Sequence, residues 1–175
     1  MYALQIAFGW SDAHLNLFHI HGEDHGVYHD GGTSFSTNPT QVRLCDFHFR
    51  INEYFRYEYD FGDGWQHSVR VEARLPLTDK RSYPCCIGGE RRSPPEDCGG
   101  PLNFMVRRDA VPLQVEDLFA DIREHLEAND MEAIRDRVPD MEELREWLTL
   151  DDFDRRAINR RLKQYATHDE GWMWQ

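Results

Sequence analysis

The chain has 175 residues, of which 40% are hydrophobic and 13% aromatic, and its formal net charge is −12. This length fits one domain with its own core, and the composition excludes an intrinsically disordered chain. The acidic balance argues against a nucleic-acid partner, because proteins of that class cluster Lys and Arg against phosphates.

No apolar run approaches the 18 residues of a membrane helix, and no charged-then-apolar leader is recognisable. We therefore expect a cytoplasmic protein that has no membrane partner. The four cysteines are then free thiols or metal ligands rather than disulfides.

The first third of the chain predicts a helix, a strand and a loop. Residues 4–10 resemble the last turns of a helix that ends at Gly9, and residues 14–22 alternate as a strand does. The strand places His19 and His21 on one face, where two imidazoles could hold a metal. Residues 22–41 read as an exposed loop, and residues 42–49 fit either a short strand or a helical turn.

Residues 54–61 and 65–75 predict a β-hairpin with an aromatic face. Two registers place the aromatic residues of both strands on the same face of the hairpin. In each of them, the numbers of two paired residues sum to an even number. A three-residue loop pairs Phe61 with Trp65. A five-residue loop pairs Phe61 with His67 and forms two cross-strand ion pairs, which favours the longer loop.

Polar side chains gather at the end of this hairpin. A carboxylate beside an imidazole can fix its tautomer and raise its basicity, so Asp63 and His67 are the catalytic candidates, with Asp60 beside them. The competing interpretation is structural, because an Asp in a tight turn bonds to neighbouring backbone amides.

Residues 76–114 are rich in Pro, Gly and Cys and predict a long loop. Zinc prefers nitrogen and sulfur ligands, so a zinc ion held by His67, Cys86 and Cys98 is the possible cofactor. The spacing of the two cysteines is no finger or ribbon signature, and buried thiols are the alternative. Arg91 could bind an anion or pair with Glu96 and Asp97.

The last third of the chain is periodic at helical spacing. Leu118, Ile122 and Leu126 begin the pattern, and Asp140 with Glu143 resembles a capping box. Strands followed by helices predict an α+β fold, with an antiparallel sheet and a long hairpin packed against helices. We divide this single domain into an α+β core at 1–110 and a helical part at 111–175.

Two stretches are specific enough to indicate a family. "YEYDFGDGWQH" (57–67) and "YPCCIGGERRSPPEDCGGP" (83–101) resemble the plasmid pRiA4b open-reading-frame-three-like family, and "GWSDAHLNLF" (9–18) resembles its Gly-Trp, His and Phe pattern. The resemblance covers roughly residues 4–104 and is weaker beyond them. It implies an α+β domain without an established activity.

This chain departs from the pattern of that family in two ways. Family members begin with a further strand, whose loss would leave a sheet edge for a second copy and so a possible homodimer. Many relatives have a cysteine where this chain has Ser93, which weakens a metal site. Some relatives are labelled resolvases, but this chain shows neither a Ser among clustered arginines nor a basic tail.

These observations favour a binding or interaction module for an unknown protein or a small polar ligand. We expect its cleft between the hairpin and the proline loop, lined by residues of both segments: Asp60, Asp63, Trp65, His67, Arg91, Glu96 and Asp97. The alternatives are a metal-assisted hydrolase that uses His67 and a carboxylate, and an accessory protein of a mobile element.

Overall fold

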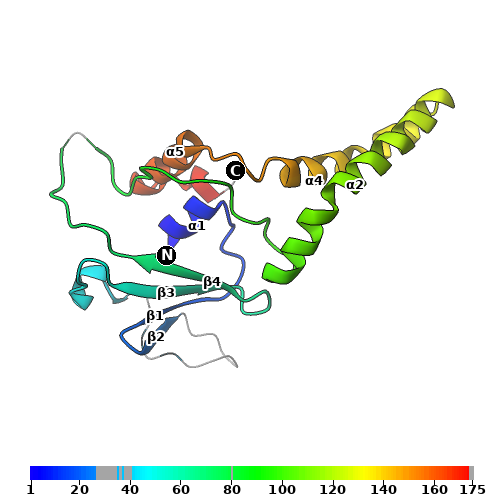
Figure 1. Cartoon of the computed structure of the whole chain (residues 1–175). Helices are drawn as coiled ribbons and strands as arrows, with labels where there is room; N and C mark the ends of the chain where they lie inside the picture. Colours follow the sequence, from blue (N-terminus) through cyan, green and yellow to red (C-terminus); the bar gives the residue numbers. More distant parts are fainter. Residues whose placement is uncertain (27–34, 36, 38–40, 80, 174–175) are drawn as a thin grey trace. The chain divides into compact units, whose positions relative to one another are not determined.

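The structure is a computed structural model that describes residues 1–26, 35, 37, 41–79 and 81–173 (Figure 1). Its contacts divide the chain into two compact units. The sheet unit consists of residues 1–85 and 158–175, and the helical unit of residues 86–157. The sequence predicted one domain with an α+β core at 1–110 and a helical part at 111–175, and that division stays a prediction.

The sheet unit contains a four-stranded antiparallel sheet in the order β2-β1-β3-β4. Its strands are β1 (Asn16–Ile20), β2 (Glu23–Gly26), β3 (Tyr54–Tyr59) and β4 (Trp65–Arg70). The predicted alternation is confirmed, since buried and less buried residues alternate along β1, β3 and β4. The predicted α+β class is confirmed as well.

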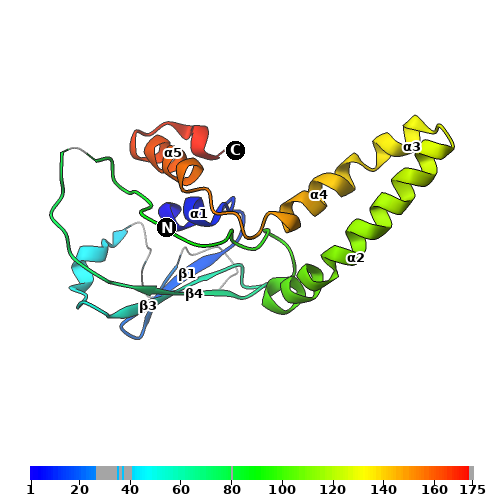
Figure 2. The same cartoon turned by 45° about the horizontal axis from the view of Figure 1, so that its top comes forward.

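One face of this sheet forms the core, together with helix α1 (Tyr2–Phe8). The helix ends at Gly9, whose φ of 78° lies in the left-handed region that glycine adopts without strain, as the sequence predicted. Gln5 of α1 donates a hydrogen bond of 2.6 Å to the hydroxyl of Tyr57. Both side chains are fully buried, so the core contains a polar link between helix and sheet. Figure 2 shows α1 above the sheet.

The hairpin register differs from both predicted ones. Tyr59 pairs with Trp65 and Tyr57 with His67. The numbers of paired residues therefore sum to an even number, as predicted, but the loop spans residues 60–64. Asp60 ends β3 early because its φ of 52° is left-handed and not extended. Arg70 consequently lies opposite Tyr54, and its guanidinium is 5.9 Å from the centre of that ring.

Two short elements are described in the segment between β1 and β3. The 3-10 helix η2 (Leu44–Phe47) settles the ambiguity over residues 42–49 in favour of a helical turn. β2 (Glu23–Gly26) lies where the sequence predicted a loop, and it extends the sheet beyond β1. The rest of the predicted loop at 27–41 lies almost entirely outside the described residues.

The helical unit is built on α2 (Gly100–Glu127), α3 (Met131–Asp136) and α4 (Val138–Leu148). The predicted loop to residue 114 is wrong, because α2 begins at Gly100. Pro101 lies in its first turn, where a missing N–H costs no helical hydrogen bond, while Pro112 lies inside the helix. The prolines and glycines of this segment led us to predict a loop where the chain forms a helix.

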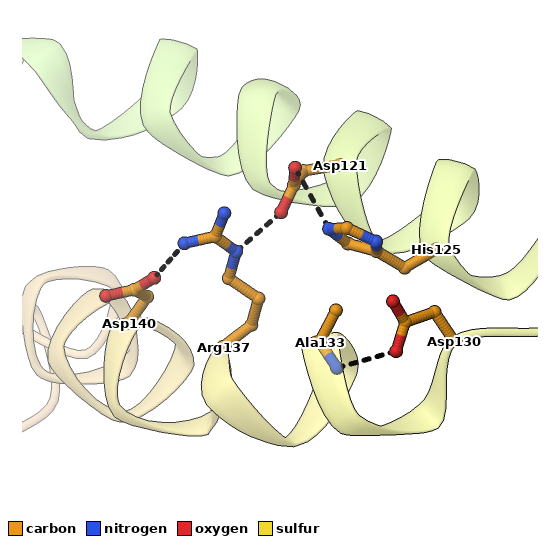
Figure 3. Close-up of polar contacts among 6 residues, drawn as sticks. All are labelled: Asp121, His125, Asp130, Ala133, Arg137 and Asp140. Atoms are coloured by element: carbon orange, nitrogen blue, oxygen red, sulfur yellow. Dashed lines mark hydrogen bonds and ion pairs between the residues drawn. The ribbon is translucent and has the colours of Figure 1, made fainter. Parts of the chain in front are cut away.

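Polar contacts hold α2 against α3 and α4 (Figure 3). Arg137 donates through Nε to Asp121 at 2.6 Å and through Nη1 to Asp140 at 3.4 Å. Asp140 lies within α4, so the predicted capping box is wrong. Asp130 caps a helix in this unit, because its carboxylate accepts the N–H of Ala133 at 3.0 Å at the start of α3.

The sheet unit is completed by most of α5 (Arg155–Ala166) and by the 3-10 helix η3 (Glu170–Met173). The ring of Tyr2 lies 5.9 Å from that of Tyr165 and 5.2 Å from that of Trp172. Arg161 donates two hydrogen bonds to the carbonyl oxygen of Trp172. None of the described helices combines the length and apolar composition that a membrane span requires.

Candidate functional site

Asp60 organises the end of the hairpin. Its Oδ1 accepts the backbone N–H of Gly62 at 3.0 Å and of Asp63 at 3.3 Å, and its carbonyl accepts that of Gly64 at 2.6 Å. The turn-stabilising role that the sequence offered for Asp63 is thus filled by Asp60. Its carboxylate is mostly buried, with 13% of the side chain exposed.

The imidazole that approaches Asp60 belongs to His14. Nε2 of His14 lies 3.8 Å from Oδ2 of Asp60, and the backbone N–H of His14 donates to the hydroxyl of Tyr59 at 3.3 Å. Sequence reasoning did not select His14, although it lies within the quoted stretch 9–18. The pair offers one nitrogen and one oxygen, both of which zinc accepts.

His67 lies among aromatic rings. Its imidazole stacks on Phe8 at 4.3 Å and meets Trp10 edge-on at 5.3 Å. Burial lowers the pKa of His67, because the charged imidazolium is desolvated there. Its buried Nε2 has no hydrogen-bond partner among the described residues. Trp65 is also buried, with its ring 6.0 Å from that of Trp10.

The residues predicted from the proline loop belong to the helical unit. The guanidinium of Arg91 lies 3.2 Å from the carboxylate of Asp151, so its observed ion pair is not the one expected with Glu96 or Asp97. Glu96 is half-buried and Asp97 is exposed. The predicted ligand-binding residues therefore come from two compact units.

The cysteines of the predicted zinc site form no disulfide with the described residues. Cys98 is buried, with 1% exposed, and its carbonyl accepts a 2.6 Å hydrogen bond from the Asn103 side chain. The Cys86 sulfur lies 3.4 Å from the carbonyl oxygen of Gly88. Since His67 belongs to the sheet unit and both cysteines to the helical unit, this zinc site stays a prediction.

The opposite face of the sheet is polar and hollowed. A depression of about 470 Å³ is lined there by side chains from β1, β3 and β4 and from the turn after β1. We call six of the lining residues the histidine face: His19, His21, Tyr54, Arg56, Gln66 and Ser68. A second depression of about 560 Å³ adjoins it through His21 and is lined by the segment that carries η2 and leads to β3.

The strand register aligns four polar residues in a row across this face. Asp24 pairs with His19, His19 with Arg56, and Arg56 with Ser68. Side chains directly opposite each other on antiparallel strands lie close enough to act on one ligand. The row therefore presents an imidazole, a guanidinium and a hydroxyl side by side.

Carboxylates fix both imidazoles of the histidine face. Nδ1 of His19 lies 2.6 Å from Asp24, and Nε2 of His21 lies 2.6 Å from Glu53. The pKa of Glu53 is lowered, mainly by the backbone N–H of Arg50 and then by the bond from His21. A carboxylate hydrogen-bonded to one ring nitrogen fixes the orientation of the ring.

Arg56 differs from these histidines, because no carboxylate among the described residues pairs with its guanidinium. Within the described part of the chain, its side chain makes no ion pair or hydrogen bond. The expected metal at His19 and His21 gains no support. No set of three His, Cys, Asp or Glu ligand atoms within 4.8 Å of one another includes either histidine among the described residues.

Sequence reasoning missed Arg56, Gln66 and Ser68. The signal was available, because period-two alternation assigns all three to the face opposite the aromatic residues. Which strands would meet across that face depends on the strand order, which the sequence does not supply.

A comparison with known protein families identifies the family of this chain. The family profile described as "Plasmid pRiA4b ORF-3-like protein" matches residues 1–162. The chain belongs to this family. The predicted resemblance is thereby confirmed, and the matched region covers the helical unit and most of the sheet unit.

Two proteins similar to this pRiA4b ORF-3-like chain are themselves without an established function. An uncharacterized protein, y4hQ of Sinorhizobium fredii (strain NBRC 101917 / NGR234), is 27% identical over 134 residues, which cover 74% of this chain and 67% of the relative. The crystal structure of MM3350, a protein of unknown function from Methanosarcina mazei Go1, is 29% identical with a TM-score of 0.52. That match covers 88% of this chain and 74% of MM3350.

Proposed function

We propose that this chain is a binding module whose histidine face recognises a small polar ligand through an anionic group, such as a carboxylate or a phosphate. Arg56 carries the proposal, because it lies in the middle of a row of donors and lacks an acidic partner among the described residues. A guanidinium matches the two oxygens of such a group bidentately.

The surrounding groups support selectivity for a polar anion. His19, held by Asp24, lies on one side of Arg56, and the Ser68 hydroxyl lies on the other. The Gln66 amide adds a donor and an acceptor, and the Tyr54 ring adds an apolar surface. Sites for small ligands commonly combine a few such polar groups with an aromatic wall.

Phosphate titration of isotope-labelled protein tests the proposal by nuclear magnetic resonance. We expect saturable shifts of the amides of His19, Arg56 and Ser68 in the native protein. Arg56→Gln should bind about tenfold or more weakly, because a charge-assisted pair contributes about 1.5–3 kcal/mol. Arg43→Gln is the matched control, since Arg43 is 81% exposed and pairs with Asp46 outside this face.

Two results would contradict this assignment. One is the absence of saturable shifts on the histidine face with both phosphate and acetate. The other is equal weakening of binding in Arg56→Gln and Arg43→Gln, which would indicate that only the general charge of the protein matters.

A second candidate function, metal-assisted hydrolysis at the end of the hairpin, is favoured by the His14–Asp60 pair. The pair supplies two ligand types that suit zinc, whose catalytic role is to lower the pKa of a bound water. Metal analysis of chelator-free protein tests it. Stoichiometric zinc that is lost in His14→Gln but retained in His48→Gln would support this function, and absence of zinc would exclude it.

The same metal analysis addresses the predicted zinc site at His67, Cys86 and Cys98. Zinc lost in Cys86→Ser and Cys98→Ser, but retained in His14→Gln, would favour that site. The third interpretation, an accessory protein of a mobile element, rests on labels of relatives. Salt-dependent retention on DNA is the measurement that would support it.

A further inference from the structure

Strand β4 forms an open edge of the sheet (Figure 1). It pairs with β3 on one side, and no described residue pairs with its other side. The opposite edge strand, β2, has four residues and is partly covered, because His25 forms a bridge with Thr37. β2 also carries two exposed acids, Glu23 and Asp24, which discourage the addition of a further strand. The edge available for pairing is therefore β4.

Alternate backbone groups of β4 point away from β3. The N–H of Val71 donates to the carbonyl of Glu53 at 2.9 Å, so along this register the residues of odd number face β3. The N–H and C=O groups of Gln66, Ser68 and Arg70 consequently point outward. Among the described residues these groups find no hydrogen-bond partner. Each of the three residues thus offers a donor and an acceptor to another strand.

β4 lacks the features that usually protect an edge strand. Its sequence, WQHSVR, contains neither Lys nor Pro, and its register with β3 runs from Trp65 to Arg70 without a bulge. Arg70 is its one permanently charged side chain, and that charge is paired with Glu72 of the same chain. A regular edge with so little charge is a template for strand addition.

The strand is complementary to itself in one antiparallel register. A two-fold axis at Ser68 places this residue opposite its own copy, and Gln66 opposite Arg70 of the second copy. All outward groups of the three residues then have partners, and no like charges lie opposite each other. An axis at His67 would leave Arg70 opposite a residue outside the strand, and an axis at Val69 would do the same to Gln66.

Antiparallel pairing also covers apolar side chains at the two ends of β4. Phe61, in the hairpin turn before the strand, is 36% exposed, while Leu75 and Leu77, which follow the strand, are each 80% exposed. In an antiparallel pair, the turn of one copy lies beside the segment that follows β4 in the other. This complementarity selects a second copy over an unrelated extended peptide.

We propose that two copies of this chain pair through β4, with the two-fold axis at Ser68, and form one continuous sheet. The homodimer expected from the sequence thereby acquires a defined edge and register. Because Ser68 lies opposite Arg56, the polar row of each histidine face continues across the axis. The two Arg56 residues are then separated by three strand spacings, or about 14 Å.

The second copy also completes the depression on the histidine face. That depression reaches the edge of the sheet at Gln66 and Ser68, where the single chain provides no further strand among its described residues. Pairing places Arg70 of the second copy beside Gln66 and adds a guanidinium to each site. This contribution to binding rests on the proposed anion site, whereas the pairing itself does not.

Sedimentation velocity with two charged variants tests the pairing. The native protein should sediment with twice the chain mass of 20.7 kDa and dissociate on dilution. Ser68→Lys and Ser68→Glu each place like charges opposite each other on the axis, so each should raise the dissociation constant of the dimer at least tenfold. An equimolar mixture of the two variants places opposite charges there and should restore the dimer.

Two control variants separate pairing from other effects. Ser82→Lys adds the same charge at an exposed serine outside β4 and should leave the dimer intact. Arg56→Gln should also remain dimeric, because Arg56 lies on β3. Loss of pairing and loss of anion binding are therefore measured independently. Far-ultraviolet circular dichroism checks that each variant folds.

Hydrogen exchange at several protein concentrations locates the interface. Exchange of the outward amides of Gln66, Ser68 and Arg70 should slow as the concentration rises and the dimer forms. The amide of Val69 faces β3 and should be protected at every concentration.

Three outcomes would overturn the proposal. A monomer whose outward amides exchange rapidly at every concentration would leave β4 free for an extended strand of another protein. A dimer that Ser68→Lys does not weaken would place the interface elsewhere. A dimer that both charged variants weaken, but their mixture does not restore, would contradict the axis at Ser68.

Discussion

At the scale of single residues, Asp60 shows how one side chain sets the length of a strand. Its left-handed backbone ends β3, and its carboxylate accepts two of the amides of the following turn. Asp and Asn tolerate this backbone region better than other residues that carry a Cβ. The same carboxylate faces His14, so one residue serves both the turn and the candidate metal site.

Replacing Asp60 separates these roles. Asp60→Ala removes the acceptor of two turn amides and places Ala at a positive φ, so the free energy of unfolding should fall by about 2–4 kcal/mol. Asp60→Asn keeps an acceptor and should cost about 1 kcal/mol or less. Urea denaturation checks both variants, and equal losses would show that the turn does not depend on the acceptor.

His67 provides a test of pH dependence. Burial lowers its pKa in the folded state, so the unfolded chain binds a proton at a higher pH than the folded chain does. Stability attributable to His67 is therefore complete above about pH 6.5, its ordinary pKa, and declines as the pH falls through that value. His67→Phe retains a ring beside Phe8 and cannot titrate.

We expect the native protein to lose more stability between pH 7.5 and pH 5 than His67→Phe does. Urea midpoints at the two pH values measure the difference, and the other eight histidines contribute equally to both proteins. Parallel pH profiles would mean that His67 is equally solvated in the folded and unfolded states.

Sequence reasoning succeeded for residues whose role is local and failed for those whose role depends on register. Gly9 was identified as a helix end because only a left-handed residue suits that position. Asp63 was preferred to Asp60 for the turn because the loop was expected to begin after Phe61. Arg56 was assigned to the correct strand, but its neighbours on β1 follow from strand pairing, which no local pattern encodes.

At the scale of elements, α2 is an exception to the rule that proline interrupts a helix. A Pro inside a helix removes one hydrogen bond and crowds the preceding turn, at a cost of about 3 kcal/mol. Pro112 nevertheless lies in the middle of a helix of 28 residues. Packing on one side of that helix, including Val111 and Phe104, offsets the cost, and such tertiary packing is not visible in local propensity.

Pro112→Ala should therefore stabilise the helical unit. The free energy of unfolding should rise by about 1–3 kcal/mol as the missing hydrogen bond forms and the crowding is relieved. Pro101→Ala is the matched control, because that proline lies in the first turn and its replacement should change stability by about 0.5 kcal/mol or less. Thermal unfolding measures the stability of both variants. Equal changes in the two would contradict this prediction.

At the scale of the whole molecule, the sequence predicted the α+β class but not the division into units. The sequence predicted an α+β core at 1–110 and a helical part at 111–175 of one domain. The observed units instead follow contacts, and the last 18 residues belong with the first 85. Aromatic contacts of Tyr2 with Tyr165 and Trp172 explain part of this, and their distance along the chain hides them from local analysis.

The C-terminal contacts predict a stability effect confined to the sheet unit. Deleting residues 170–175 removes the ring beside Tyr2 and the carbonyl that accepts two bonds from Arg161, whose pKa burial lowers. The free energy of unfolding should fall by about 2–4 kcal/mol. Trp172→Ala keeps the backbone carbonyl, so its free energy of unfolding should fall by less than that of the deletion variant.

Hydrogen exchange measures this loss separately in the two units. Amides of β3 and β4 should lose protection in the deletion variant, whereas amides of α2 and α4 should keep theirs. Uniform loss of protection through α2 would contradict a separate response of the sheet unit.

The assembly of the sheet unit from both parts of the chain also has a consequence for its biosynthesis. When Cys85 has left the ribosome, the strands and α1 are available, but the partners of Tyr2 have yet to be translated. Synthesis of residues 86–175 takes on the order of 5–20 seconds. All of residues 86–157 are translated before the partners of Tyr2, so the ring of Tyr2 lacks these contacts until the helical unit has been synthesised.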